Sequence, residues 1–287
     1  MLKKIIFSGC STTAGNELYE EEHVQNYKKM SFKEARTVKK LYDDQFELVE
    51  SYNYENSYPA LVGEIMGAKV ENISYPGQSN KEIVGRIIAY FDKDWYEDTA
   101  AIIQMTTLNR FFIKYKEDNN IDVVGSFVAV PDSLDDKLTR NQNNILQEMM
   151  FEFFPESLLV IDDIIYFNYA IEYLRAKNVK CFITMPDGSF TDWLNWKRLN
   201  GNTVIDDNYR KEIASQLTLK EVVLKNDRDP IYLTSFVESI ARKFVSNNLI
   251  PPWTDFLKED CRLPRHHFDK ESHHAVAEKM FEELRKC

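Results

Sequence analysis

The strongest constraint on the fold is the alternation of short apolar runs with segments of helical periodicity. Five runs have the length and composition of buried strands: Lys4 to Ser8, Lys69 to Ser74, Ala100 to Met105, Val179 to Met185 and Pro230 to Thr234. Amphipathic segments lie between them, such as Ser57 to Met66, which Gly67 would end as a C-cap. Strands that alternate with helices predict a parallel sheet covered on both faces, with ligands at the carboxyl ends of the strands. We therefore expect a three-layer α/β/α sandwich.

Length and composition are consistent with one large domain. The chain has 287 residues, 44% of them hydrophobic, with only 9 glycines and 9 prolines, so it can bury a substantial core. One segment, residues 17–56, is charged and tyrosine-rich with helical spacing. We predict a single domain over residues 1–287 with a helical insertion at about 17–56. Its tyrosines would form either a wall of the substrate site or a plain surface excursion.

The charge balance disfavours two classes of partner. A formal charge of −10 repels nucleic-acid phosphates and anionic membrane surfaces. No segment reaches the roughly 18 apolar residues of a membrane span, and the run from Ile5 to Phe7 is too short for a signal peptide. The four cysteines lie far apart, which is typical of free thiols in a reducing compartment. We expect a cytoplasmic protein that binds no nucleic acid and spans no membrane; the oligomeric state is left open.

A serine directly after the first predicted strand is a candidate nucleophile. Ser11 lies in the small-residue segment from Ser8 to Gly15. On a strand-to-helix turn its hydroxyl would be exposed at the edge of the sheet, with its own N–H and the helix dipole facing the same point. Helix capping by small polar residues is the alternative interpretation. A phosphate-binding loop is disfavoured, because neither the glycine spacing nor the required lysine is present.

The turn after the second predicted strand contains a candidate oxyanion donor. In the run from Pro76 to Asn80, Gly77 has no side chain to keep its N–H from an oxyanion, and Asn80 could hold the loop or the substrate. An ordinary turn followed by a helix cap is the alternative.

Four of the five histidines cluster before or within the last predicted helix. His273 shares a helical stripe with apolar residues, which favours a packed core histidine. His267 precedes the helix and is freer to face a site. Zinc ligation by His267, Asp269 and His273 is an alternative, but their spacing matches no strong zinc signature, so we expect no metal and no organic cofactor.

Together these pieces resemble the SGNH (GDSL-type) hydrolases over almost the whole chain. Four stretches match that family's sequence blocks in order: Gly9-Cys10-Ser11, Asn72 to Asn80, Met105-Thr106-Thr107 and His267 to His273. The resemblance implies a flavodoxin-like sandwich, with Ser11 as nucleophile, His267 as base and the N–H of Gly77 in the oxyanion hole. Divergent members carried by large tailed bacteriophages are the most similar kind, which would place the protein in the host cytoplasm or the virion.

The first and third blocks depart from the family pattern. Cys10 replaces the aspartate of Gly-Asp-Ser, which is tolerable because that side chain is not the nucleophile. Thr106 and Thr107 stand where the third block has asparagine, so one of these hydroxyls would have to donate to the oxyanion.

The orienting carboxylate is missing from its family position. Pro264 and Arg265 stand where an aspartate precedes the catalytic histidine. Within the histidine cluster, Glu271 is the only acidic residue three before a histidine, and with His274 it forms a second-ranked pair. Asp260 or a backbone carbonyl could also substitute for the aspartate. Loss of this carboxylate would slow catalysis by orders of magnitude.

Two functional hypotheses follow. The first is a serine esterase or deacylase that removes an O-acyl group from a carbohydrate or lipid-like substrate, using Ser11 and His267 as catalytic residues and Gly77, Asn80, Thr106 and Thr107 as oxyanion or substrate-binding residues. The second is a catalytically impaired hydrolase fold that serves as a binding or structural module, for example in a phage particle.

Overall fold

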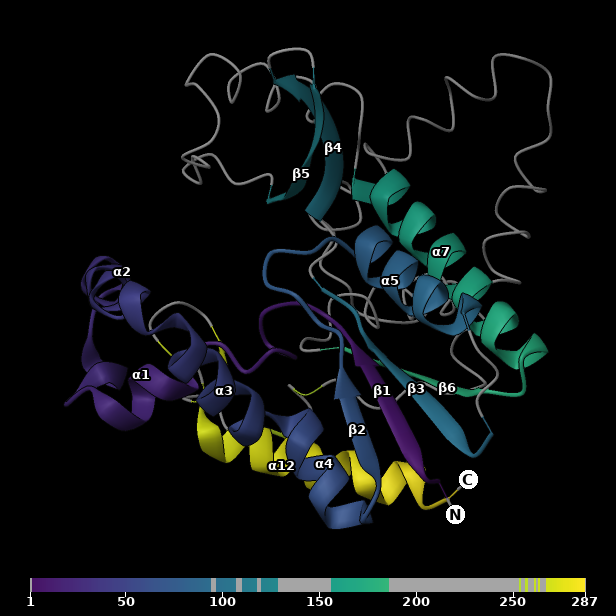
Figure 1. Ribbon diagram of the computed structural model, residues 1–287, viewed down its shortest axis with the longest axis horizontal. Coiled ribbons are helices and arrows are strands. Elements are labelled where there is room, and N and C mark those ends of the chain that lie inside the picture. Colours follow the sequence, from purple (N-terminus) through teal and green to yellow (C-terminus); the bar gives the residue numbers. More distant parts are fainter. Residues whose placement is uncertain are drawn as a thin grey trace, which may run out of the picture.

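A four-stranded parallel sheet forms the centre of the molecule in the computed structural model (Figure 1). The structure describes residues 2–93, 97–106, 110–117, 120–128, 156–185, 253, 256–257, 261, 263 and 267–286. The sheet has the order β2-β1-β3-β6, from strands β1 (Lys4–Ser8), β2 (Lys69–Asn72), β3 (Thr99–Gln104) and β6 (Lys180–Thr184). Four of the five strands expected from the sequence are therefore present, in a doubly wound order. The expected strand at 230–234 lies outside the described residues.

Two helices cover one face of the sheet. Helix α5 (Asn80–Asp92) begins at a capping box, in which Ser79 and Glu82 each bind the other's backbone N–H. It packs beside α7 (Glu156–Ala176) over alternate residues of the strands, such as Ile6 and Ile103. The alternation follows from the two-residue period of a strand, which sends neighbouring side chains to opposite faces.

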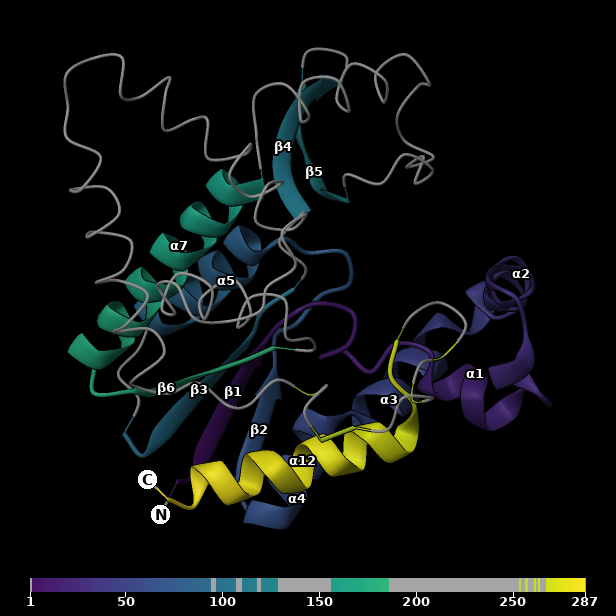
Figure 2. The same cartoon turned by 180° about the vertical axis from the view of Figure 1, so that it is seen from behind.

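The other face is covered by α4 (Tyr58–Met66) and α12 (Lys270–Leu284), which run side by side (Figure 2). Their apolar residues pack against Ile5, Phe7 and Ile102, and Trp253 is fully buried among them. The two covered faces confirm the three-layer α/β/α sandwich. Gly67 ends α4 in a left-handed conformation, as the sequence predicts.

Residues 17–56 form a helical excursion between β1 and α4 (Figure 1). It comprises α1 (Leu18–His23), the 3₁₀ turn η1 (Tyr27–Lys29), α2 (Phe32–Leu41), the 3₁₀ turn η2 (Asp43–Gln45) and α3 (Phe46–Asn56). We refer to residues 17–56 as the insertion. Helix α1 lies beside the N-terminal end of α12, so the insertion sits at the carboxyl edge of the sheet (Figure 2).

The remaining described elements are a hairpin and isolated residues near the C-terminus. Strands β4 (Arg110–Glu117) and β5 (Asn120–Val128) pair antiparallel. Cys10, Cys181 and Cys261 are buried free thiols. None of the helices in the described ranges combines the length and apolar character needed to cross a bilayer.

Candidate active site

Ser11 lies on a tight turn at the carboxyl end of β1. After Ser8 the chain coils back on itself: the N–H of Ala14 donates to the carbonyl of Cys10 (3.1 Å), and that of Asn16 to the carbonyl of Ser11 (3.0 Å). Gly9 is required at the start of this coil, because a Cβ there would collide with the side chain of Thr13. The turn thus presents the Ser11 hydroxyl at the edge of the sheet, where the sequence predicted a nucleophile.

Buried polar contacts hold this turn against the neighbouring strands. The Thr13 hydroxyl bonds to the side chain of Gln104 at the end of β3, and the Tyr58 hydroxyl donates to Thr13 Oγ1 (3.2 Å). The amide of Asn72, at the end of β2, donates to the Thr13 carbonyl (2.8 Å). Tyr58 is fully buried, and burial raises the pKa of its phenol, so it stays a neutral donor. These contacts restrict movement of the Ser11 backbone.

His267 reaches the same point from the segment before α12. Its Nε2 lies 2.8 Å from Ser11 Oγ. The main chain on either side is fixed: the N–H of Leu263 donates to the His267 carbonyl (2.7 Å), and that of Asp269 to the carbonyl of Cys261 (3.0 Å). Residues 256 positions apart in the sequence are therefore in hydrogen-bond contact.

The other ring nitrogen of His267 contacts a carboxylate that the sequence analysis did not identify. Glu17 Oε2 lies 2.6 Å from His267 Nδ1 and also accepts the backbone N–H of His267 (3.3 Å). The second oxygen, Oε1, accepts the Tyr27 hydroxyl (2.7 Å). The Glu17 side chain is completely buried, so water screens its interaction with the imidazole only weakly.

Glu17 also has an unusual backbone conformation. Its φ of 76° lies in the left-handed region, which non-glycine residues seldom adopt and which costs of the order of 1 kcal/mol. Gly15, at φ 75°, precedes it, where a Cβ would clash with the backbone of Asn53. These two residues reverse the chain after the nucleophile turn, and this reversal brings the Glu17 side chain to His267.

With Glu17 ionised, the contacts of His267 favour one tautomer of its ring. An ionised carboxylate can only accept hydrogen bonds, so the proton of the neutral ring is on Nδ1 and is donated to Glu17. The lone pair on Nε2 then faces the Ser11 hydroxyl, which donates to it. A serine, a histidine and a buried carboxylate thus form one chain of hydrogen bonds, the arrangement that lets serine lose its proton during attack on a carbonyl.

The backbone N–H groups of Ser11 and Gly77 are candidates to bind an oxyanion. Within the described part of the chain, the N–H groups of Ser11 and Gly77 donate to no protein acceptor. Gly77 has φ 80° and is exposed, and a Cβ there would meet nothing within 4 Å. The Tyr75 N–H donates to the Gly9 carbonyl (3.3 Å), which ties the Gly77 loop to the nucleophile turn. Thr106, at the end of β3, has a hydroxyl without a partner among the described residues.

Asn80 is bound on both sides of its amide. Its Oδ1 accepts the N–H of Thr106 (2.7 Å), and its Nδ2 donates to the Thr106 carbonyl (3.3 Å) and to Asp163 Oδ2 (2.6 Å). Asn80 therefore links α5, the end of β3 and α7, which supports the interpretation that it holds the loop. Direct contact of Asn80 with substrate stays a prediction.

The other histidines and acids of the sequence analysis are placed as follows. His273 is buried in the α12 core, where its Nδ1 accepts the N–H of Tyr58 (2.9 Å), as expected for a packed histidine. Burial lowers the pKa of His273 to about 3, so it is neutral. His274 and Glu271 are exposed on α12, away from the core face. Thr107, Asp260, Pro264 and Arg265 lie outside the described residues, and the described part contains no group of three potential metal ligands.

The sequence offered little to single out Glu17. It is one of several acids at the start of a charged segment, with Glu20, Glu21 and Glu22 close behind. The one signal is its position after Gly15-Asn16, a pair typical of turns, which separates it from the helical acids that follow. The carboxylate was expected near His267 in the sequence, whereas Glu17 is 250 positions away.

Comparisons with known proteins concern the fold. No protein-family model matches the sequence, and no curated protein sequence matches it. Among solved structures, the chain is similar to a proposed lipolytic protein of the G-D-S-L family from Desulfitobacterium hafniense (12% identity, 98% of each chain, TM-score 0.42). It is also similar to the esterase EstA from Pseudoalteromonas (13% identity, 99% of this chain and 97% of that one, TM-score 0.40). A third is the acetyl xylan esterase Est2A from Butyrivibrio proteoclasticus (11% identity, 99% and 64%, TM-score 0.44).

Proposed function

We propose that this protein is a serine hydrolase of ester bonds, with Ser11 as nucleophile, His267 as general base and Glu17 as the carboxylate that orients and stabilises the imidazole. The observation that carries the proposal is the chain of two short contacts, 2.8 Å from Ser11 Oγ to Nε2 and 2.6 Å from Nδ1 to Glu17 Oε2. Contacts of this length and order are those that general-base activation of a serine requires.

The chemistry would run in two halves. In the first, Ser11 Oγ attacks the ester carbonyl carbon as its proton moves to His267 Nε2, and the carbonyl oxygen takes up the negative charge. The free N–H groups of Ser11 and Gly77, with the Thr106 hydroxyl, would stabilise that charge. The intermediate then collapses, and His267 returns its proton to the departing alcohol. In the second half, His267 takes a proton from water as that water attacks the acyl-serine carbon; the bond to Ser11 Oγ then breaks, the acid leaves, and His267 returns the proton to Ser11 Oγ.

Glu17 would supply two effects in each half. Its hydrogen bond keeps the proton on Nδ1, so that the basic nitrogen faces Ser11. Its negative charge stabilises the imidazolium that forms when His267 takes the serine proton. The carboxylate absent from the family position before the histidine is thereby replaced from the other end of the chain.

A binding or structural role alone gives no reason for the conformation of Glu17. The residue combines a positive φ with full burial of a carboxyl group, and both oppose folding. Such costs are typical of catalytic sites, where side chains are held in the geometry that catalysis needs although this lowers the stability of the fold. The site therefore supports the hydrolase over the binding module. We propose an O-acylated carbohydrate or a lipid-like ester as the substrate class, with no metal or organic cofactor.

A fluorophosphonate probe tests the proposal directly, because it reacts with activated serines. We expect one adduct on the intact protein, mapped to Ser11 by peptide mass spectrometry. Ser11→Ala should abolish the adduct, whereas Ser51→Ala, an exposed serine on α3, should label like the wild type. Absence of labelling at Ser11, together with no turnover of a panel of acetyl and longer acyl esters, would leave the binding module as the better account.

A further inference from the structure

The turn η1 contacts both the carboxylate that binds His267 and the segment that carries His267. Tyr27, its first residue, donates its hydroxyl to Glu17 Oε1 (2.7 Å). Lys28, the next residue, places its Nζ 2.9 Å from Asp269 Oδ2 and 2.9 Å from Glu21 Oε1. Asp269 is only two residues after His267. One short turn of the insertion is therefore bonded to the carboxylate and to the segment that carries the base.

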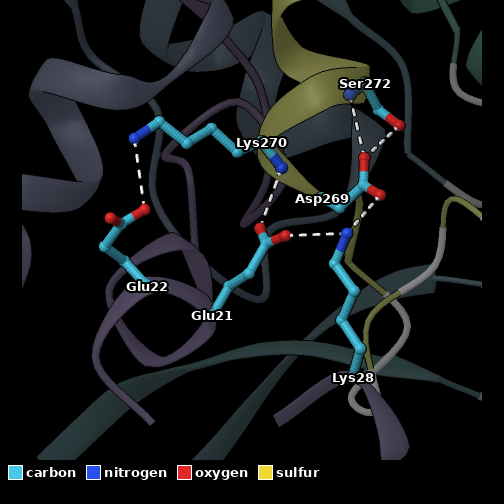
Figure 3. A network of polar contacts seen from close by, with 6 residues as sticks. All are labelled: Glu21, Glu22, Lys28, Asp269, Lys270 and Ser272. Atoms are coloured by element: carbon cyan, nitrogen blue, oxygen red, sulfur yellow. Dashed lines mark hydrogen bonds and ion pairs between the residues drawn. The ribbon is translucent and has the colours of Figure 1, made fainter. Parts of the chain in front are cut away.

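The bridge made by Lys28 ends on the first turn of α12 (Figure 3). Asp269 is the N-cap of this helix, and its Oδ1 accepts the backbone N–H (2.9 Å) and the hydroxyl (2.6 Å) of Ser272. Glu21 Oε2 accepts the backbone N–H of Lys270 (2.8 Å). The backbone N–H groups at the start of a helix have no acceptor within the helix. In α12 two of them find acceptors in side chains, and one of these side chains belongs to the insertion.

The charges of this bridge are only partly solvated. The side chains of Asp269 and Glu21 are 8% and 13% exposed, and that of Lys28 is 47% exposed. Burial by itself would raise the pKa of Asp269, but the hydrogen bonds from Ser272 and Lys28 keep it below its ordinary value. Burial would likewise lower the pKa of Lys28, and its bonds to Asp269 and Glu21 reverse this and raise it. Asp269 and Lys28 are therefore both charged at neutral pH.

An apolar contact joins the same two segments. Leu263 is buried with Tyr27 and Ala35 in a small core of the insertion that is separate from the two cores flanking the sheet. The N–H of Leu263 donates to the His267 carbonyl (2.7 Å). The segment around His267 is thus held by the insertion before the histidine, through Leu263, and after it, through Asp269.

We infer that Lys28 is a positioning residue, which holds His267 at the distance from Ser11 and Glu17 that proton transfer needs, and that the insertion is therefore part of the catalytic apparatus. This inference rests on the proposed hydrolase function. The sequence left a wall of the substrate site as one of two roles for the insertion, and this inference adds that the insertion also positions the general base, His267. Tyr19 packs edge to face against both Tyr42 and Tyr52, and these contacts stabilise the insertion.

Kinetics of Lys28→Met test the positioning role. The substitution keeps most of the apolar stem and removes the bridge. We expect kcat to fall by about 10- to 100-fold, the effect of a small misplacement of a catalytic group, with KM changed less than about twofold. Lys28→Arg can still reach both carboxylates and should restore most of kcat. The matched control is Lys270→Met, which removes a more loosely held lysine (3.3 Å from Glu22) from the same interface and should leave kcat unchanged.

A spectroscopic readout separates this inference from the proposed function. A histidine Nδ1–H held by a buried carboxylate gives a downfield, slowly exchanging proton resonance in NMR. We expect it in the wild type, Lys28→Arg and Lys270→Met, and expect it to vanish in folded Lys28→Met. If Lys28→Met does not fold, Asp269→Asn removes the ion pair with Lys28 from the other side. This variant should fold, because asparagine still caps the helix.

The outcomes are distinct. If the wild type hydrolyses no ester but its resonance is lost in Lys28→Met, the proposed function fails and the positioning of His267 by Lys28 stands. A resonance that is absent from the wild type or retained in Lys28→Met overturns the inference. In an active enzyme, an unchanged kcat in Lys28→Met does so too.

Discussion

Replacing Glu17 by glutamine should slow ester hydrolysis far more than any other substitution of an acid in the described part of the site. The change keeps the size of the side chain and removes its charge. The amide can also donate to Nδ1, which would turn the basic nitrogen away from Ser11. We therefore expect a loss in kcat from two sources, the wrong tautomer and an unstabilised imidazolium.

The charge effect can be sized from the geometry. Glu17 Oε2 is 2.6 Å from Nδ1, and the carboxylate is fully buried. Opposite charges centred about 4 Å apart attract by about 4 kcal/mol at an effective dielectric constant of about 20. If that attraction exists only once the imidazolium forms, its loss lowers kcat by about three powers of ten. The assay is steady-state hydrolysis of a chromogenic acetyl ester, with circular dichroism to verify folding.

Two controls make this measurement decisive. Glu22→Gln removes an exposed acid of the same helix, and Glu271→Gln removes the acid that the sequence ranked second; both should leave kcat within about twofold of the wild type. A folded Glu17→Gln protein with kcat within about tenfold of the wild type would refute the role of Glu17. A large loss in Glu271→Gln would point to a different carboxylate.

Three further predictions concern Ser11, His273 and Gly77. Ser11→Ala should abolish turnover yet change the free energy of unfolding by no more than about 1 kcal/mol in a denaturant titration, because its hydroxyl bonds only to His267 among the described residues. The pKa of His273 is about 3 in the folded state and about 6.5 in the unfolded state, so as the pH falls the unfolded state binds the proton first. The free energy of unfolding should therefore be full above about pH 6.5 and lower by about 2 kcal/mol at pH 5. The melting temperature of His273→Asn should depend less on pH than that of the wild type. Gly77→Ala and Gly67→Ala both place a side chain at positive φ in open space, so each should lower the free energy of unfolding by about 1 kcal/mol. Only Gly77→Ala should lower kcat, and equal kcat values for the two variants would count against Gly77 in the oxyanion hole.

Much of the fold could be predicted because its signals are local. Runs such as Ala100 to Met105 are apolar and short, and the segment ending at Gly67 has the period and the cap of a helix. These features depend on neighbours in the chain, so the sequence alone predicts the α/β/α layers and four of the strands. Ser11 and His267 were predicted as site residues in the same way, since each stands directly beside a predictable element.

The third member of the site could not be read from the sequence, and the reason is physical. Glu17 contacts His267 because its backbone has a positive φ, because Tyr27 binds its second oxygen, and because the insertion folds back onto α12. None of these is a property of a residue and its neighbours in sequence. The sequence by itself determined the sheet, its covering helices and the two residues at its edge. Only the tertiary structure decided which carboxylate is buried against the histidine, because that choice depends on contacts between segments 250 residues apart.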